Sequence, residues 1–207
     1  MASKPRGRLI ALEGTRGPEL AETARKLVRQ IGRSKMEGGV SGWDASSIFY
    51  ELRKGNYDGP NPSPRTLLLL YASDLAFRLR WEIRPAVEEG MLVVAAPYVE
   101  SAIAFGKAAG ISRRWLVDLF SFAPKPDACY RLKEKRQTAE WRGKRSEGFL
   151  EFCCKTLIKG SPAWNAAEIQ GKFNDYLEAL EKRGGCATLT EKLLAGISAD
   201  KATPGEF

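Results

Sequence analysis

Short apolar runs alternate along the chain with segments in which apolar residues recur every three or four positions. The first run, residues 9–12, ends at a Glu-Gly pair, and Pro18 and Gly32 bracket the segment that follows. Proline suits the first turn of a helix and glycine suits its end. We therefore predict a strand, a glycine turn and a helix. The apolar stripe of this helix would consist of Leu20, Ala24, Leu27 and Ile31.

The alternation continues toward the C-terminus. After a glycine-rich passage at 38–42, Asp44 can cap a short helix that reaches Lys54, and a long helix is expected from about 65 to 89, with a kink near Pro85. Strands are predicted at 91–96 and about 128–132, separated by helices near 99–109 and 113–122. The remaining chain is predicted to be helical, with Ile169, Phe173, Leu177 and Leu180 on one face and Leu189, Leu193, Leu194 and Ile197 on another.

This order of elements predicts an α/β fold in three layers, with a mostly parallel sheet flanked by helices. A chain of 207 residues, 43% of them hydrophobic, is long enough for one substantial core. We expect one domain over residues 1–198, a basic loop at about 131–146 and a flexible tail at 199–207. The apolar run after the basic start is too short for a signal segment or a membrane span, which favours a soluble cytoplasmic protein.

Composition limits the chemistry. A formal net charge of +8 favours an anionic partner such as a nucleotide, a nucleic acid, an acidic protein or a membrane surface. The four cysteines form no C-x-x-C pair and the chain contains no histidine, so no metal site is expected and the thiols are interpreted as buried or idle. Without histidine, hydrolases that use Ser-His or Cys-His pairs are excluded.

Several segments, in order and spacing, resemble thymidylate kinases over residues 8–157. They are Leu9 to Gly17, Leu67 to Asp74, Val93 to Ser101, and Lys125-Pro126-Asp127. The resemblance implies a P-loop NTPase-like fold, phosphorylation of a nucleoside monophosphate by ATP with Mg²⁺, and a homodimer formed through helices beside the sheet. Matching positions are Glu13, Gly14, Gly17, Tyr71, Tyr98 and Ser101.

The phosphate-binding loop departs from the family pattern. In the register G-x-x-x-x-G-K-[ST] from Gly14, the chain has Glu19 for the second glycine, Leu20 for the lysine and Ala21 for the hydroxyl. A carboxylate at position 19 would repel a triphosphate. Leu20 either completes the apolar stripe of the helix or belongs to a rebuilt phosphate site. The degenerate loop thus consists of Glu13, Gly14, Arg16, Gly17, Glu19, Leu20 and Ala21.

The substrate side also differs from the family. Ala96-Pro97-Tyr98 stands where the resemblance implies Asp-Arg-Tyr, whose arginine grips the substrate phosphate. Leu75 replaces an arginine that reaches the base, and Arg16 replaces an aspartate near the sugar. Tyr71 and Tyr98 either frame a cleft or belong to the core. The former substrate cleft would be lined by Tyr71, Leu75, Ala96, Pro97, Tyr98 and Ser101.

A basic run follows the last predicted strand of the alternation. The resemblance makes Arg142 and Arg145 candidate lid arginines that contact the transferred phosphate. Alternatively the run is a contact surface for an anionic partner, or a solvated loop. The candidate contact residues for a partner are Lys133, Lys135, Arg136 and Trp141.

These losses lead to the hypothesis of a catalytically inactive kinase that acts as a binding, scaffold or regulatory subunit through protein contacts, with no cofactor. The alternative is a divergent, active dTMP kinase that uses ATP and Mg²⁺, with displaced cations such as Arg16 or the lid arginines. Nucleic-acid binding through the basic run is a third hypothesis. For a homodimer, Leu68, Leu79 and Ile83 are candidate contacts, although core packing explains them equally well.

Overall fold

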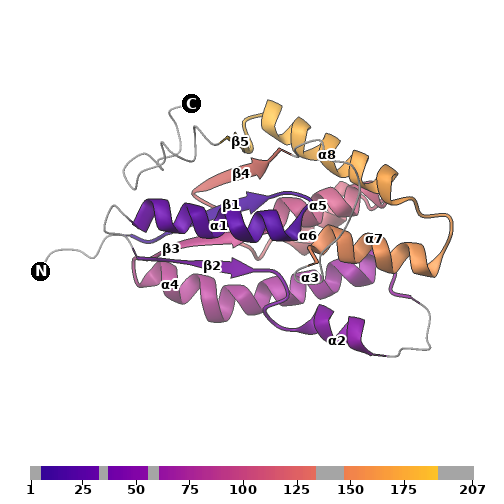
Figure 1. Cartoon of the computed structure of the whole chain (residues 1–207), viewed down its shortest axis with the longest axis horizontal. Helices are drawn as coiled ribbons and strands as arrows, with labels where there is room; N and C mark the ends of the chain where they lie inside the picture. The colour runs from indigo at the N-terminus through magenta and orange to yellow at the C-terminus, as the bar shows by residue number, and fades with distance from the viewer. Residues whose placement is uncertain (1–5, 33–36, 56–60, 134–146, 191–207) are drawn as a thin grey trace, which may run out of the picture.

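Strand β1 (Arg8–Glu13) is the centre of a five-stranded parallel sheet in the order β2-β3-β1-β4-β5 (Figure 1). The other strands are β2 (Gly38–Gly42), β3 (Leu92–Ala96), β4 (Ala128–Leu132) and β5 (Ala187–Leu189). The computed structural model describes residues 6–32, 37–55, 61–133 and 147–190. The predicted α/β fold with a parallel sheet flanked by helices is confirmed.

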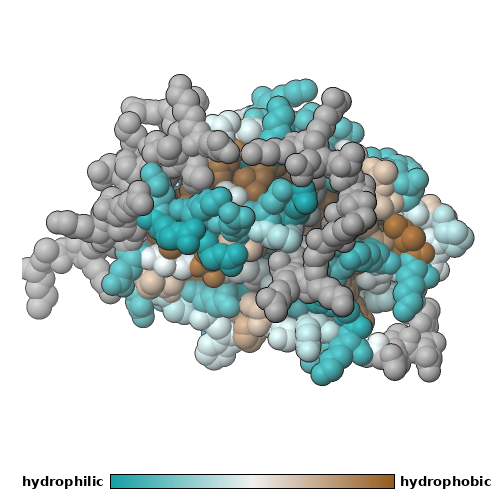
Figure 2. Space-filling model, in the orientation of Figure 1, coloured by the Kyte–Doolittle hydropathy of each residue, from teal (hydrophilic) through white to brown (hydrophobic). Residues whose placement is uncertain are grey.

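Alternate residues of β1 belong to two separate cores, because successive side chains of a strand point to opposite faces of a sheet. Ile10 and Leu12 pack under helix α1 (Gly17–Gly32), whereas Leu9 and Ala11 pack on the other face. The stripe predicted for α1 is buried in the first of these cores: Leu20, Ala24, Leu27 and Ile31. The outer side of α1 is mostly hydrophilic, as Figure 2 shows.

Several helices contribute to the larger core on the opposite face of the sheet. Five of them are α3 (Pro64–Arg78), α5 (Val99–Ala108), α6 (Arg113–Leu119), α7 (Phe149–Gly160) and α8 (Ala166–Lys182). Helices α5 and α6 pack so closely that a Cβ at Gly106 would lie 2.4 Å from a methyl carbon of Leu116. The sheet is therefore the middle layer of three.

The long helix expected from 65 to 89 is continuous but not uniformly α-helical. Helix α3 passes into a π-helical turn, η1 (Leu79–Ile83), and then into α4 (Arg84–Glu88). Pro85 has no N–H to donate, and an extra residue in the preceding turn is one way in which a helix adapts to such a break. The predicted irregularity near Pro85 is thus a π turn immediately before it.

Two strands were missed by the sequence pattern. Residues 38–42 contain three glycines and were described only as a glycine-rich passage, but they form β2, which is held by parallel pairing with β3. Leu189, expected on a helical face, lies in β5 and pairs with Leu132. In both cases a distant strand supplies the pairing that decides the conformation.

Helix α2 (Ile48–Lys54) is shorter than expected, but its predicted cap is present. The two carboxylate oxygens of Asp44 accept hydrogen bonds from the N–H groups of Phe49 (2.7 Å) and Tyr50 (2.8 Å). Asp44 thus satisfies orphan donors of the first turn from outside the helix.

Some expectations fall on residues that the structure does not describe. The tail at 199–207 lies outside the described residues, as do the positions Leu193, Leu194 and Ile197 and most of the basic loop, 134–146. Within the described ranges, no helix is both long and apolar enough to cross a membrane.

We call the segment from Gly14 to Gly17, which joins β1 to α1, the glycine loop. Replacing Leu20 by alanine tests whether this side chain stabilises the core or belongs to a phosphate site at the glycine loop. Leu20 is only 2% exposed, so Leu20→Ala should lower the free energy of unfolding by about 2–5 kcal/mol. Urea denaturation of both proteins measures this difference. Arg25→Ala, on the exposed side of the same helix, should change stability by less than about 0.5 kcal/mol. Equal effects of the two substitutions would contradict the packing role of Leu20.

Candidate functional site

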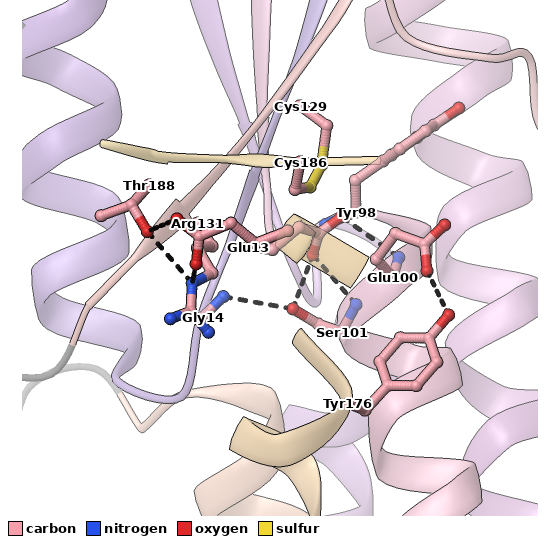
Figure 3. Close-up of a disulfide and its surroundings, with 11 residues drawn as sticks. Glu13, Gly14, Tyr98, Glu100, Ser101, Cys129, Arg131, Tyr176, Cys186 and Thr188 are labelled. Carbon is pink, nitrogen blue, oxygen red and sulfur yellow. Dashed lines mark hydrogen bonds and ion pairs between the residues drawn. A yellow bond between two sulfur atoms is a disulfide. The ribbon is translucent and has the colours of Figure 1, made fainter. Parts of the chain in front are cut away.

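The carboxylate of Glu13, at the end of β1, holds the first turn of α5. It accepts hydrogen bonds from the N–H groups of Tyr98 (3.2 Å), Glu100 (3.1 Å) and Ser101 (3.0 Å). The Ser101 hydroxyl donates a fourth bond to the same carboxylate at 2.6 Å and accepts one from the N–H of Gly14 at 3.3 Å (Figure 3). Glu13 therefore connects the glycine loop to the segment that follows β3.

Burial dominates the electrostatics of Glu13. The side chain is completely enclosed, and this burial raises its pKa to about 7, even though the bonds from Ser101 and the Tyr98 N–H lower it. The negative charge of Glu100 nearby raises the pKa further. Glu13 is thus poised to gain or lose a proton near neutral pH.

The carboxylate of Glu19, in the first turn of α1, forms an ion pair with an arginine of the glycine loop. The guanidinium of Arg16 lies 3.0 Å from the carboxylate of Glu19, and both side chains are exposed, at 42% and 44%. The expectation that Glu19 presents uncompensated repulsion to a triphosphate is therefore wrong, because Arg16 neutralises it. Ala21 is half-buried on α1.

Gly148, the residue before the first residue of α7, packs directly against the glycine loop. A Cβ on Gly17 would lie 2.5 Å from the Cα of Gly148, and a Cβ on Gly148 would lie 2.5 Å from the backbone nitrogen of Gly17. Trp43 extends this contact, since its indole N–H donates to the carbonyl of Glu147 at 3.0 Å. The start of α7 therefore covers one side of the loop.

The residues of the expected substrate cleft lie together, but in the core. Tyr71 is fully buried, and its hydroxyl donates to the carbonyl of Tyr98 at 2.7 Å. The ring of Phe149 packs on Tyr71 with 4.4 Å between centroids. This arrangement corresponds to the packing interpretation of the two tyrosines. Other cleft candidates are buried as well: Leu75, Ala96, Pro97, Tyr98 and Ser101.

The structure adds Arg78, which the motif comparison did not single out. Its side chain is fully buried, with Nε donating to the hydroxyl of Ser41 at 2.9 Å and Nη2 donating to the carbonyls of Ser41 at 2.7 Å and Pro97 at 3.0 Å. Burial raises the pKa of Tyr71, and the positive charge of Arg78 opposes that shift. The only signal in the sequence is its spacing, seven residues after Tyr71 on the buried helix face.

Arg131, counted in the basic run by its sequence position, is not a surface residue. Its side chain is 6% exposed and lies 2.9 Å from the carboxylate of Glu181 and 3.5 Å from that of Glu178. Its Nε also donates to the hydroxyl of Thr188, which in turn donates to Glu181 (Figure 3). Arg131 therefore joins β4 to α8 and β5.

Lys133 is exposed and follows the last residue of β4. The other basic-run candidates, Lys135, Arg136, Trp141, Arg142 and Arg145, lie outside the described residues. Leu132, next to Lys133, places its Cβ 3.5 Å from where a Cβ of Gly14 would stand. The described end of the basic run is thus adjacent to the glycine loop.

Two cysteines that were expected to be idle form a disulfide. Cys129 on β4 is bonded to Cys186, with 4.6 Å between their Cα atoms (Figure 3). Cys153 and Cys154 are free and buried. Within the described ranges, no three His, Cys, Asp or Glu side chains are grouped so as to hold a metal ion.

The homodimer contacts proposed from sequence are part of the core. Leu68, Leu79 and Ile83 are 0%, 2% and 1% exposed. The exposed apolar side chains of this helical segment are instead Leu69, Phe77 and Trp81, at 50%, 40% and 65%. The pattern missed them because a helix with apolar residues on several sides gives no unique buried face.

Comparison with known proteins identifies the family. No protein-family model matches the chain. The chain is similar to the probable thymidylate kinase of Pyrococcus abyssi, with 31% identity over 159 residues, which cover 69% of this chain and 74% of the relative. The chain belongs to the thymidylate kinase family.

Other relatives agree with this assignment. The probable thymidylate kinase of Pyrobaculum aerophilum is 30% identical over 145 residues, covering 69% of this chain and 73% of the relative. That of Thermococcus onnurineus is 35% identical over 127 residues, covering 57% and 62%. The resemblance inferred from the sequence segments is therefore confirmed.

The family assignment corrects the leading functional hypothesis. The relatives are named probable thymidylate kinase. Their names contradict the hypothesis that the chain is a catalytically inactive scaffold or regulatory subunit. The relatives favour the alternative, a divergent dTMP kinase. The inactive-kinase hypothesis treated the loss of the loop lysine, at the position of Leu20, as decisive.

The raised pKa of Glu13 predicts a specific dependence of stability on pH. Between pH 4.5 and about 7 the folded protein holds the Glu13 proton more tightly than the unfolded chain, so stability falls as the pH rises through this window. Relative to Glu13→Gln, which does not titrate, the protein should lose about 3 kcal/mol of unfolding free energy. Urea denaturation at several pH values measures this loss. Glu88→Gln, an exposed carboxyl, should follow the unmodified protein, and a parallel profile for Glu13→Gln would contradict the assignment.

Proposed function

We propose that the chain is a divergent dTMP kinase that transfers the terminal phosphoryl group of ATP to dTMP. The observation that carries this proposal is its similarity to proteins named probable thymidylate kinase over 69% of its length. Further support comes from the carboxyl ends of the parallel strands, where such folds bind their ligands. Glu13 ends β1 there and Gly14 follows it, and Tyr98 and Ser101 follow β3.

Two cations are candidates to replace the missing lysine of the glycine loop: Arg16 lies in the loop, and Lys133 follows β4, the strand that pairs with β1. Within the described residues, the ion pair that Arg16 forms is an exposed one with Glu19. Exposed ion pairs contribute at most about 1 kcal/mol to the stability of a protein. Arg16 pairs with Glu19 through Nη1, and its other N–H groups are proposed to donate to a triphosphate while Glu19 stays neutralised. Lys133 is exposed beside Leu132, which contacts Gly14. Both are proposed to neutralise phosphate oxygens.

Magnesium is expected to arrive with the nucleotide. Mg²⁺ in kinases keeps several water ligands and is bound through substrate phosphates with one or two protein groups, so a dedicated cluster of acidic residues is not needed. When bound, it neutralises charge on the transferred phosphate. The contact of Gly148 with Gly17 means that the start of α7 must move for a triphosphate to lie along the loop.

Phosphoryl transfer should be measurable with the full-length protein. We expect conversion of dTMP to dTDP in the presence of ATP and Mg²⁺, followed by phosphorus NMR or nucleotide chromatography. Arg16→Ala should lower kcat/KM for ATP by about 10- to 100-fold, because a charged hydrogen bond to phosphate is lost.

Arg25→Ala is the matched control, since this arginine lies on the exposed side of α1. Its kcat/KM should equal that of the unmodified protein, and EDTA should abolish the reaction in both. If dTDP forms no faster than in a protein-free sample over a range of dTMP concentrations, the proposed activity is wrong. If both arginine variants behave alike, only the role of Arg16 is wrong.

We also propose that the chain pairs with a second copy of itself through Leu69, Phe77 and Trp81. These three exposed side chains recur at intervals of four and eight residues along the continuous segment from α3 to η1. Apolar and aromatic residues are typical of the centre of an interface. A two-fold axis would place the same stripe on both partners, as closed dimers require.

A charge at the centre of this stripe should separate the partners. Trp81→Glu is expected to shift the molar mass measured by sedimentation equilibrium from that of a dimer to that of a monomer, because two carboxylates would be buried without partners. Val117→Glu, at another exposed apolar position on α6, should leave the dimer intact. A monomeric unmodified protein, or a dimer that persists in Trp81→Glu, would exclude this interface.

A further inference from the structure

Among the described residues, no carboxylate forms an ion pair with the positively charged guanidinium of Arg78. Its side chain is fully buried and donates hydrogen bonds to the hydroxyl and carbonyl of Ser41 and to the carbonyl of Pro97. The Tyr71 side chain also interacts with the guanidinium. The Nη1 atom is buried and finds no hydrogen-bond acceptor among the residues that the structure describes. A buried charge without an anion or full hydrogen bonding is costly, so this guanidinium lacks a partner that its chemistry demands.

The neighbouring carboxylates are already engaged elsewhere. Asp74 accepts from the backbone N–H groups of Asp44 and Ser46 and from the Ser46 hydroxyl. Glu82 accepts a 2.6 Å bond from the Ser41 hydroxyl, so it reaches Arg78 only through that hydroxyl. This relay accounts for Nε but leaves Nη1 without an acceptor.

The guanidinium reaches the segment in which the family resemblance implies an arginine that grips the substrate phosphate. The family's arginine at position 97 is replaced here by proline, and the carbonyl of that proline lies 3.0 Å from Arg78 Nη2. The family's arginine at position 75 is replaced by Leu75, and Arg78 follows one turn later on the same buried side of α3. Ser41 and Pro97 lie at the carboxyl ends of β2 and β3, the edge at which α/β folds bind ligands.

We propose that Arg78 binds the 5′-phosphate of the acceptor nucleotide, in place of the arginine that the family carries at position 97. The proposal deepens the proposed function, on which it rests for the identity of the acceptor as dTMP. A phosphate supplies the negative charge and the acceptor oxygens that Nη1 lacks. Because Nη1 is enclosed, the phosphate reaches it only when residues around Pro97 move aside, and substrate-linked movements of this kind are common in kinases.

Binding of two ligands that differ only in the phosphate tests this assignment. Calorimetric titration of the full-length protein with dTMP and with thymidine gives both dissociation constants without ATP. Arg78→Met should weaken dTMP binding by about 10- to 100-fold and leave thymidine binding unchanged. Arg78→Lys, which keeps the charge but not the planar fork, should lie between the two.

The matched control is Arg84→Met, an exposed arginine six residues further along the same helical segment, which should bind both ligands like the unmodified protein. The proposal is overturned if Arg78→Met weakens both ligands equally or neither, or if the unmodified protein does not prefer dTMP to thymidine. If circular dichroism shows that Arg78→Met is unfolded, the ratio of the two constants in Arg78→Lys decides, and an unchanged ratio overturns the proposal.

This test is independent of phosphoryl transfer. If the preference for dTMP over thymidine depends on Arg78 but no dTDP forms, the proposed kinase activity is wrong and the proposed role of Arg78 is supported. Formation of dTDP with an unchanged ligand preference in both Arg78 variants would do the reverse.

Discussion

The arrangement of the site depends on one buried carboxylate. Glu13 ends the central strand and accepts four hydrogen bonds from the start of α5. Without it, three backbone N–H groups at a helix start and the Ser101 hydroxyl would be buried without an acceptor. The carboxylate thereby fixes the distance between the segments that follow β1 and β3, and every residue assigned to the loop or to the acceptor side is placed relative to that connection.

Positive charge in this protein has been distributed differently from the pattern that the family resemblance implies. The loop lysine is absent, but Arg16 neutralises Glu19 at the loop. The arginine at position 97 is absent, but Arg78 reaches the carbonyl of Pro97 from α3. Arg131, by contrast, is occupied by two glutamates and a threonine, which leaves it a structural role. Motif comparison by position detects the losses, but it does not detect a side chain that approaches the same segment from another element, as Arg78 does from α3.

Local patterns were sufficient for elements whose own residues determine them. The strand at 9–12 and the stripe of α1 were predicted, as were β3, β4 and the apolar face of α8, because each has a strong period or a continuous apolar run. Strand β2 was not predicted, because its glycines have little strand preference and its conformation comes from pairing with β3. In the site, Glu13 and Ser101 were recognised by resemblance, whereas Arg78 was not, since its partners lie 37 and 19 residues away along the chain.

The central position of β1 has a consequence for synthesis on the ribosome. Its neighbours are β3, which begins at Leu92, and β4, which ends at Leu132, so the first strand to be made must wait for both. Parallel pairing between such distant segments is slow compared with helix formation. The apolar run Leu9-Ile10-Ala11-Leu12 therefore cannot be buried between its two neighbours until Leu132 has been made, and an exposed run of this kind favours aggregation during synthesis.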